Sequence, residues 1–495
     1  MNTVFSAPQQ SAGQLNRQQR LVVLAICCMS LLIVGLDATI VNVALPSIQR
    51  SLHASVAGLQ WTLDAYTLVL ASLLMLGGST ADRIGRRRVF QIGLGVFSLA
   101  SLLCALAPSL PMLVAARALQ GVGGAMLNPV AMSIIRNVFE DPRERAEAIG
   151  VWGGVFGLSM ALGPVLGGAL VDGVGWPAVF YVNVPVGLAA IILTARYVPE
   201  SQAPKPRRLD PGGQILIIAA LATLTYAIIE GPRHGWTSAE IVGLFAASAC
   251  AFVALVLYEL RQKEPLLEVR FFSSIPFAGA SAIAVLAFAG FNGFLFLNTL
   301  YLQSVRGLSP LDAGLYMLPT AAMLLIFSPL SGRLVGRSGA RRPTVLGALG
   351  MLAGAAMLLG LTTHTSSAYL LASYFAFGFG VGLINPPITN TAVSGMPGEQ
   401  AGVAAAVAST SRVVGVTLGV AVIGAITGGS LGARIGHGFA AATHSGWAII
   451  VGLSAAIFVL GFLTTGRWAT DTARRTAERF RQRPQTALAT SGGGS

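Results

Sequence analysis

The sequence predicts an all-α polytopic membrane protein, built from two six-helix bundles with two further helices inserted between them. Three observations predict this class. First, 54% of the 495 residues are hydrophobic, only 10% are charged, and the mean hydropathy is +0.71. Second, apolar stretches of roughly 20 residues, the length that crosses a bilayer as a helix, recur from Leu21 to Gly461. Third, sequence patterns of the first half return in the second half.

Fourteen apolar stretches are candidate transmembrane helices. They cover residues 21–45, 57–79, 89–107, 111–135, 146–170, 177–195, 213–230, 239–258, 276–302, 311–332, 343–361, 368–393, 401–427 and 446–465. The segments between them are at most about 20 residues long, which leaves no space for a soluble catalytic domain. We therefore do not expect an enzyme.

The 32 Lys and Arg residues outnumber the 19 acids, and their positions explain the excess. If the amino terminus is cytoplasmic, 26 of these cations fall in cytoplasmic segments, four lie outside and two lie within spans. This distribution obeys the positive-inside rule, so we expect a multi-pass protein of the cytoplasmic (inner) membrane with both termini in the cytoplasm. The basic clusters are interpreted as topology signals and contacts to membrane lipids, and a nucleic-acid partner is not expected. The four cysteines all lie in predicted spans, with neither a disulfide framework nor metal-ligand spacing.

Two segments of the first half are echoed in the second half at nearly the same offset. Residues 78–87 resemble 332–341, and residues 121–129 resemble 378–386. Two matches in register predict two bundles of the same orientation, with a substrate site at their interface near the middle of the membrane. The predicted organisation is a cytoplasmic amino-terminal segment (1–20), a first bundle (21–196), cytoplasmic linkers with the two inserted helices (197–275), a second bundle (276–465), and a basic cytoplasmic tail (466–495) that ends in a linker-like Ser-Gly-Gly-Gly-Ser.

A permanent cation, Arg117, lies within the span 111–135. A guanidinium group inside a bilayer costs several kcal/mol or more, so it is expected to face protein or a water-filled cavity and to have a partner. Asp37 and Asp64 lie at the same depth in the membrane as Arg117, to within about one helical turn, counted at about 1.5 Å per residue from the outer end of each span. We predict Asp37 as the principal proton carrier, Arg117 as the group that competes with the proton, and Asp64 as a second carrier or a cation-attracting acid. A static ion pair without a transport role is the alternative.

Several motifs, in order along the chain, resemble those of the 14-span drug:proton antiporter branch of the major facilitator superfamily. The matching segments are 36–46, 78–88, 117–125, 163–168, 180–187, 304–310 and 409–415. The resemblance implies the major facilitator fold, multidrug efflux by alternating access, and the proton motive force as driving force without any cofactor. Two positions depart from the family pattern: Pro177 stands where Arg is usual, and Gly336 stands where the first half has Asp82. The second departure weakens the expectation that both halves latch the cytoplasmic side equally.

The resemblance also assigns a cytoplasmic gate and a hinge. The gate loop would latch the outward-open state by charge pairing, with a pure topology role as the alternative; its residues are Gly78, Asp82, Arg83, Gly85 and Arg86. Small residues along the fifth span permit close helix contact and a proline removes a backbone hydrogen bond, which suits a flexible seam between the bundles. The predicted antiporter hinge consists of Gly157, Gly163, Pro164, Gly167 and Gly168, and ordinary helix packing is the alternative.

Aromatic and amide side chains near the expected cavity would bind a lipophilic cation through ring faces and polar contacts. The candidates are Trp61, Tyr66, Asn183, Phe291, Asn292, Asn298, Tyr301 and Arg412. For each aromatic residue, lipid-facing or core packing is the alternative, and Arg412 could equally bond to backbone carbonyl groups.

The leading hypothesis is a monomeric, proton-coupled antiporter that exports amphipathic, cationic drugs or antibiotics; its partners are a lipophilic small molecule, protons and membrane lipids, and no metal is expected. Three alternatives remain: an uptake symporter on the same fold, a dedicated exporter of one secondary metabolite, and a passive channel or transporter-like receptor. The sequence leaves open what the seventh and eighth spans do, including the role of Glu230 near the end of the seventh.

Overall fold

A computed structural model describes residues 15–203, 209–262, 265–394, 401–431, 439–466 and 468–476, together with residues 478 and 480. The first half contains α1 (Arg17–Leu52), α2 (Val56–Ile84), α3 (Arg86–Ala105), α4 (Leu110–Val138), α5 (Pro142–Gly173), α6 (Ala178–Tyr181) and α7 (Asn183–Tyr197). Two helices and a short 3-10 turn follow: α8 (Pro211–His234), α9 (Ala239–Glu259) and η2 (Val269–Ser273). The second half contains α10 (Ile275–Leu300), the π-helical turn η3 (Tyr301–Val305), α11 (Pro310–Tyr316), α12 (Leu318–Ser338), α13 (Arg341–Leu358), α14 (Ser367–Val393), α15 (Ala401–Leu431) and α16 (Phe439–Leu463).

All fourteen predicted spans are helical, and the prediction of an all-helical membrane fold is confirmed. Within the described residues, thirteen helical segments are long and apolar enough to cross a membrane. The remaining predicted span, 343–361, corresponds to α13, an 18-residue helix that is not among these thirteen but packs along α14 and α16. The exact number of fourteen crossings therefore stays a prediction.

Polar caps and one glycine set several helix ends in the first half. The Asn16 side chain accepts a hydrogen bond from the Gln19 backbone at 2.8 Å, and the Gln19 side chain accepts one from the Asn16 backbone, which forms a capping box at the start of α1. The Ser55 hydroxyl caps α2 by accepting a hydrogen bond from the Gly58 backbone at 3.2 Å. Gly85 separates α2 from α3 with φ at +117°, a backbone conformation that favours glycine.

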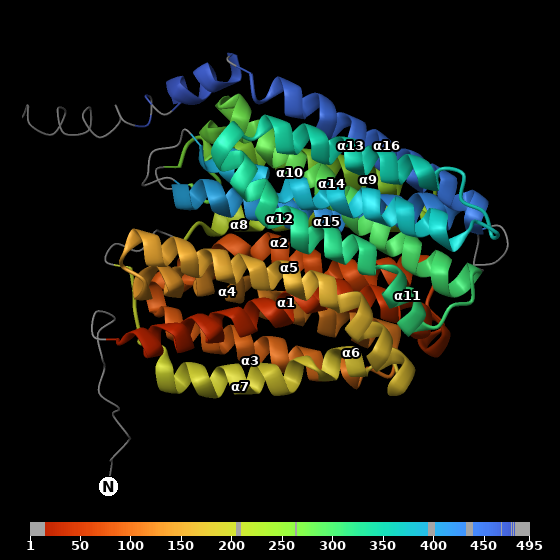
Figure 1. Ribbon diagram of the computed structural model, residues 1–495, viewed down its shortest axis with the longest axis horizontal. Helices are drawn as coiled ribbons and strands as arrows, with labels where there is room; N and C mark the ends of the chain where they lie inside the picture. The colour runs from red at the N-terminus through yellow and green to blue at the C-terminus, as the bar shows by residue number, and fades with distance from the viewer. Residues whose placement is uncertain are drawn as a thin grey trace, which may run out of the picture.

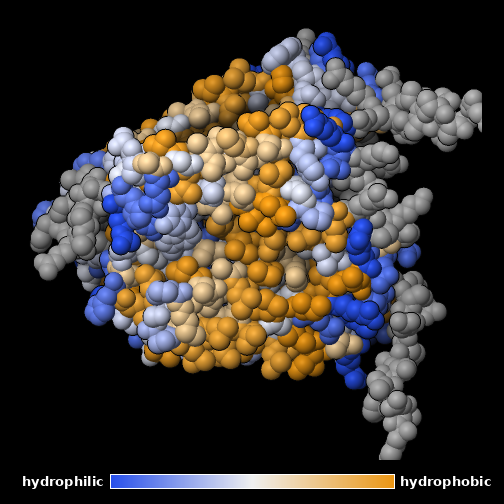
Figure 2. Space-filling model, turned by 180° about the vertical axis from the view of Figure 1, so that it is seen from behind, coloured by the Kyte–Doolittle hydropathy of each residue, from blue (hydrophilic) through white to orange (hydrophobic). Residues whose placement is uncertain are grey.

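The helices form two stacked halves with a common direction of their long axes (Figure 1). In Figure 1, α1 to α7 form the lower half and α10 to α16 the upper half. Each half has aromatic packing of its own: Tyr66 lies against Phe97 in the first half, and Phe294 stacks on Phe377 in the second with ring centroids 4.2 Å apart. Figure 2 shows a broad hydrophobic belt between hydrophilic ends, as a membrane-spanning protein requires.

The halves touch along α2 with α15, α5 with α11 and α12, and α1 with α10. We call the end of the molecule that carries the Arg83–Arg88 cluster the basic end, and the end that carries the turn at His53 the far end. The close contacts lie toward the far end: the Gln303 amide donates to the Val43 carbonyl group at 2.8 Å, and the Leu311 backbone donates to Asp172 at 2.9 Å. The halves are therefore joined tightly at the far end.

The helices α8 and α9 lie beside this seam. Helix α8 packs against α2 of the first half and α15 of the second half, whereas α9 packs mainly against α8. The Gln214 amide of α8 donates to the Ser72 carbonyl group of α2 at 2.7 Å. Apolar side chains of α9 such as Phe252, which is 58% exposed, face outward where lipid would cover them.

Part of the basic tail is helical and packs on the rest of the molecule. The Ile275 backbone donates a hydrogen bond to the Thr472 hydroxyl at 3.0 Å, and the Phe480 ring lies 5.2 Å from the Phe271 ring. Ala469 and Ala473 are buried against the body of the protein, whereas Trp468 is 68% exposed. The predicted linker at the extreme carboxyl terminus lies outside the described residues.

Candidate functional site

The centre of the first half holds a fully buried ion pair. The Arg117 guanidinium of α4 donates to the Asp37 carboxylate of α1 at 2.5 Å, and neither side chain is more than 1% exposed. The Arg117 Nε donates to the Thr62 carbonyl group of α2 at 2.9 Å. One side chain thus ties three helices together. Because two charges taken out of water need full compensation, this pair depends on its remaining partners.

Gln120 is the chief neutral partner of the pair. Its amide oxygen accepts a hydrogen bond from Arg117 at 2.7 Å, and its amide nitrogen donates to Asp37 at 2.9 Å and to the Ser101 hydroxyl at 2.9 Å. The Asn183 amide of α7 adds longer contacts of 3.4 Å to Asp37 and 3.5 Å to Ser101. The result is a closed polar network in which both Asp37 oxygens have partners.

Aromatic rings enclose the same network. The Arg117 guanidinium lies 4.4 Å from the centre of the Tyr66 ring and 5.8 Å from that of Phe180. Ring faces attract a guanidinium group and at the same time exclude water. Sequence reasoning named Tyr66 as a substrate-cavity residue, and here its ring covers the ion pair. Gln120, Ser101 and Thr62 were not predicted; only the position of Gln120, one turn after Arg117 on the same helix face, pointed to it.

Asp64 does not join this network. The side chain is fully buried, and neither carboxylate oxygen has a hydrogen-bond partner among the described residues. Its neighbours on the same face of α2 contact α15: the Gln60 amide donates to the Ala421 carbonyl group at 2.8 Å, and the Thr417 hydroxyl donates to Thr67 at 2.9 Å. The helical spacing of residues 60, 64 and 67 therefore places Asp64 at the seam between the two halves.

A cavity between the halves opens beside α5, α10, α12 and α14. It is lined by Gly153, Gly157, Met160, Phe288, Phe291, Leu324, Ser328, Val381, Gly382 and Asn385. Two of the predicted residues, Phe291 of the cavity and Gly157 of the hinge, lie in this lining. The cavity is small, about 40 Å³, and mostly apolar, with few amide and hydroxyl groups.

Arg412 lies close to the cavity. Its guanidinium group donates to the Thr389 hydroxyl and, at 3.4 Å, to the Asn385 carbonyl group, and it lies 5.8 Å from the Phe288 ring centre. The Nε of Arg412 has no hydrogen-bond partner in the described part of the chain. Both predicted roles, a backbone contact and a substrate contact, are thus compatible with its position.

The other candidates of the second half have partners within that half. The Asn292 amide donates to the Phe288 carbonyl group of its own helix at 3.1 Å. Asn298 accepts a hydrogen bond from the Tyr374 hydroxyl at 2.6 Å, and the Tyr301 hydroxyl donates to the Thr362 carbonyl group at 2.6 Å. None of the three belongs to the lining of the central cavity.

The predicted gate loop makes hydrogen bonds and ion pairs within the first half. The Arg86 guanidinium donates to Asp82 at 3.0 Å, and the Arg86 backbone donates to the Ser201 carbonyl group at 2.9 Å. The Glu200 carboxylate accepts from the Arg87 backbone at 3.1 Å, and a methyl group added at Gly85 would lie within 2.9 Å of it. Sequence reasoning missed Glu200, which lies in the segment after α7 and far from the motif in sequence. Gly78 packs on Pro129 of α4, also within the first half.

The five predicted hinge residues divide into three environments. Gly163 and Gly167 pack on α1, where Thr39 and Ile40 would obstruct a side chain. A methyl group at Gly168 would lie 2.5 Å from the Pro310 carbonyl oxygen of α11, and Pro164 approaches Gly314 of the same helix. A methyl group added at Gly157 would meet no described atom within 4 Å, because Gly157 faces the cavity.

The buried charges, the cavity at the seam and the two helical halves define the class of the protein: it is a polytopic membrane transporter. The chain belongs to the major facilitator superfamily, whose family model matches residues 27–420. The predicted family is therefore confirmed, whereas the 14-span branch remains a prediction. This family consists of transporters and not of enzymes.

Relatives of known name match over most of the chain. The multidrug resistance protein Stp of Mycobacterium tuberculosis is 40% identical over 85% of this chain and 78% of its own length. The tetracenomycin C resistance and export protein of Streptomyces glaucescens is 38% identical, with 81% and 74% covered. The methylenomycin A resistance protein of Streptomyces coelicolor is also 38% identical, with 79% and 82% covered.

The fold is also similar to that of a solved structure. This is a bacterial homologue of the human lysosomal transporter Spinster, in an inward-facing and unoccupied conformation. The TM-score is 0.63 at 19% sequence identity, with 94% of this chain and 98% of the other covered. This likeness supports the fold.

Proposed function

We propose that the protein is a proton-coupled antiporter of the 14-span branch, which exports amphipathic, cationic drugs or antibiotics across the cytoplasmic membrane by alternating access. The observation that carries the proposal is the ion pair of Asp37 and Arg117, fully buried in a half that lies against a central cavity. The names of the relatives support drug export. In this proposal the basic end faces the cytoplasm, in accordance with the positive-inside rule.

Asp37 is the proposed proton carrier because it has two states that its partners distinguish. When it is ionised, Arg117 and Gln120 stabilise the carboxylate. A proton that reaches Asp37 removes its attraction for Arg117 and frees the guanidinium to turn toward other acceptors. Protonation and the arrangement of α1, α2 and α4 are thereby coupled, since Arg117 also holds the Thr62 carbonyl group.

Asp64 is proposed as the second acid. A carboxyl group without a partner at the seam favours its neutral form while the halves are closed on it. Separation of α2 from α15 would admit water and a cation to the same group. Asp64 would then change between a protonated and an ionised state in step with the opening of the far end.

The cavity supports a lipophilic substrate. Phe288 and Phe291 offer aromatic surface, and the glycines of α5 leave space beside them. A membrane potential supplies about 2.3 kcal/mol per charge per 100 mV, and each pH unit adds about 1.4 kcal/mol. One proton could therefore sustain a large concentration ratio of substrate.

Asp37→Asn is the decisive variant. In proteoliposomes with an imposed pH gradient, we expect it to abolish uphill substrate transport while downhill exchange of substrate persists, because the amide is neutral in every state. Asp312→Asn, at an exposed acid that bonds to Ser309, is the matched control and should transport normally. Undiminished, proton-dependent export by Asp37→Asn would refute the assignment.

A dedicated exporter of one secondary metabolite is the second candidate. Two of the named relatives are resistance proteins for a single antibiotic each, whereas the third is named a multidrug resistance protein. A panel of cations, neutral aromatics and antibiotics, assayed in everted vesicles with a pH-sensitive dye, separates the two. Proton release with one compound alone would favour the dedicated exporter.

A further inference from the structure

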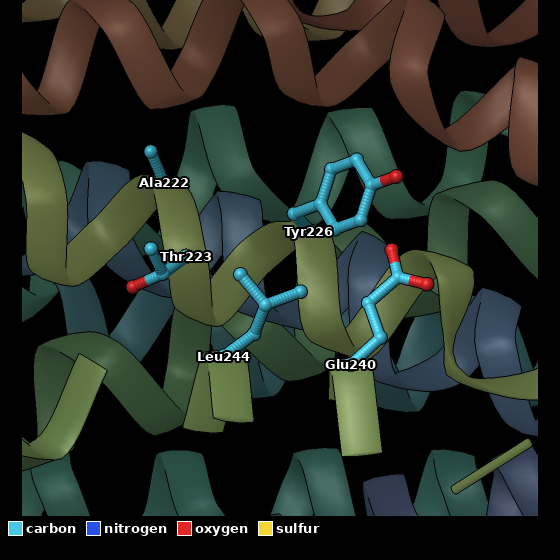
Figure 3. Close-up of a pocket in the computed structure, with 5 residues that line it drawn as sticks. All are labelled: Ala222, Thr223, Tyr226, Glu240 and Leu244. Carbon is cyan, nitrogen blue, oxygen red and sulfur yellow. The ribbon is translucent and has the colours of Figure 1, made fainter. Parts of the chain in front are cut away.

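Helices α8 and α9, which have no role in the proposed mechanism, form a cleft near the far end (Figure 3). The lining residues are Ala222, Thr223 and Tyr226 of α8 with Glu240 and Leu244 of α9. Its volume of about 390 Å³ lies within the range of small-molecule sites, about 300–1,000 Å³. The cleft is therefore large enough for an organic ligand.

The position of the cleft restricts its ligand to an amphipathic molecule. Val242, which is 52% exposed, belongs to the same turns of α9 and would face lipid. Glu240 is the second residue of α9, so it lies at the edge of the apolar belt where water is available. A ligand would have its apolar body beside Ala222 and Leu244 and its polar group beside Glu240.

The polar groups of the cleft favour a positive charge on the ligand. Figure 3 shows the Glu240 carboxylate on the same side of the cleft as the Tyr226 ring. Behind Tyr226, the Trp61 ring of α2 lies 6.0 Å away and donates its N–H to Glu230 at 2.9 Å. Glu230 is 9% exposed, and its second oxygen has no hydrogen-bond partner in the described part of the chain. The lining thus offers one carboxylate, Glu240, and one aromatic ring, Tyr226, with the Trp61 ring and Glu230 behind them. Carboxylates and ring faces are the groups that recognise organic cations.

Two basic side chains near the far end already approach these carboxylates. Arg233 approaches Glu230 only to 3.9 Å, and its side chain is 79% exposed. His234 contacts Glu240 at 2.7 Å with a side chain that is 31% exposed. Pairs this exposed to solvent are weak, so a ligand cation could replace either basic partner.

We propose that the cleft between α8 and α9 is a second binding site, for an amphipathic organic cation whose charged head lies between Glu240 and the Tyr226 ring. The site uses none of the residues of the proton-coupling network, so it does not depend on that mechanism. Because Trp61 belongs to α2, the site also adjoins the seam where Gln60 contacts α15. It gives the two additional helices a role in ligand binding.

Photoaffinity labelling tests this site. The full-length protein in phosphatidylglycerol nanodiscs is labelled with an azide derivative of tetraphenylphosphonium, and the modified peptides are identified by mass spectrometry. We expect labelling within residues 222–244, reduced at least tenfold in the double variant Tyr226→Leu/Glu240→Gln. Tyr369→Leu, at a tyrosine with similar exposure on α14, is the matched control and should leave the labelling unchanged.

Three further measurements complete the test. Ala222→Trp fills the cleft without changing charge, and should block the labelling even if the double variant folds poorly. Asp37→Asn should retain the labelling, so failure of the proton-coupling proposal and failure of this site are distinguishable. Competition by phosphatidylethanolamine in the nanodisc would show that the same cation site binds the ammonium group of a lipid headgroup. Labelling confined to the central cavity, or unchanged in both cleft variants, would overturn the proposal.

Discussion

At the residue scale, the planar shape of the Arg117 guanidinium group matters as much as its charge. Its guanidinium group serves Asp37, Gln120 and the Thr62 carbonyl group at once, which a lysine ammonium on a flexible chain could not reproduce in the same geometry. A buried pair of this kind is costly to break but can be replaced as a unit. The two charges therefore depend on each other for stability.

A double-variant cycle measures this dependence. We expect Arg117→Met to destabilise the protein by about 3–5 kcal/mol, because it leaves Asp37 buried without its cation. The double variant Asp37→Asn/Arg117→Met should recover most of this loss, as seen in thermal unfolding of the purified protein. Destabilisation of the double variant by the sum of the two single effects would show that the two residues act independently.

Gly85 gives a second prediction at this scale. Its φ of +117° strains any other residue, and an added methyl group would meet the Glu200 carboxylate. Gly85→Ala should therefore cost about 1–3 kcal/mol and loosen the segment after α7 from the gate loop. Limited proteolysis near residue 200 reports the loosening. Gly95→Ala, with nothing near it on α3, is the control and should not increase cleavage.

The sequence was sufficient to pair Asp37 with Arg117, because charges in apolar helices are few and helical rise gives their depth. It was not sufficient to find Gln120, Ser101 or Glu200. Uncharged polar residues are common in packed membrane helices, and Glu200 reaches the gate loop only through the return of the chain after α7. The depth of Asp64 in the membrane also could not show that its side chain faces the seam instead of Arg117. The direction of the side chain depends on how α2 is rotated about its axis.

At the element scale, the halves meet through backbone contacts of α5 and α11. Pro164 and Gly168 approach Gly314 and Pro310 so closely that a side chain on either glycine would obstruct the contact. Apolar periodicity predicted the helices but not the division of the tenth span into α11 and α12, since both pieces are apolar. The small residues of the fifth span were the available signal for the close approach.

Gly168→Val tests whether this contact closes the far end. The larger side chain should shift the conformational equilibrium toward separation of α5 and α11. Spin labels at Val174 and Ala368, on opposite halves, should then show a distance distribution shifted by several ångströms in pulsed electron paramagnetic resonance. Gly157→Val faces the open cavity and should leave the distribution unchanged. Equal distributions in all three proteins would exclude a closing role for this contact.

At the scale of the whole molecule, the contacts between the halves are unevenly distributed. Gln60, Gln303 and Asp172 make hydrogen bonds across the seam toward the far end. Toward the basic end, Gly153 and Gly157 of α5 face open space. The duplication in the sequence predicted two halves and a site between them, but not which end is closed. Two similar halves can rock either way, and sequence patterns do not record the state.

The accessibility of the cavity from each end can be measured directly. In a variant without native cysteines, Ser328→Cys places a thiol in the cavity lining and Val174→Cys places one at the far end, where the side chain is 77% exposed. If the basic end is cytoplasmic, a membrane-impermeant maleimide should label Ser328→Cys in everted vesicles and Val174→Cys in right-side-out vesicles. A substrate that occupies the cavity should slow the first reaction and not the second. Labelling of Ser328→Cys from the Val174 side alone would mean that the dominant state in the membrane is open at the far end.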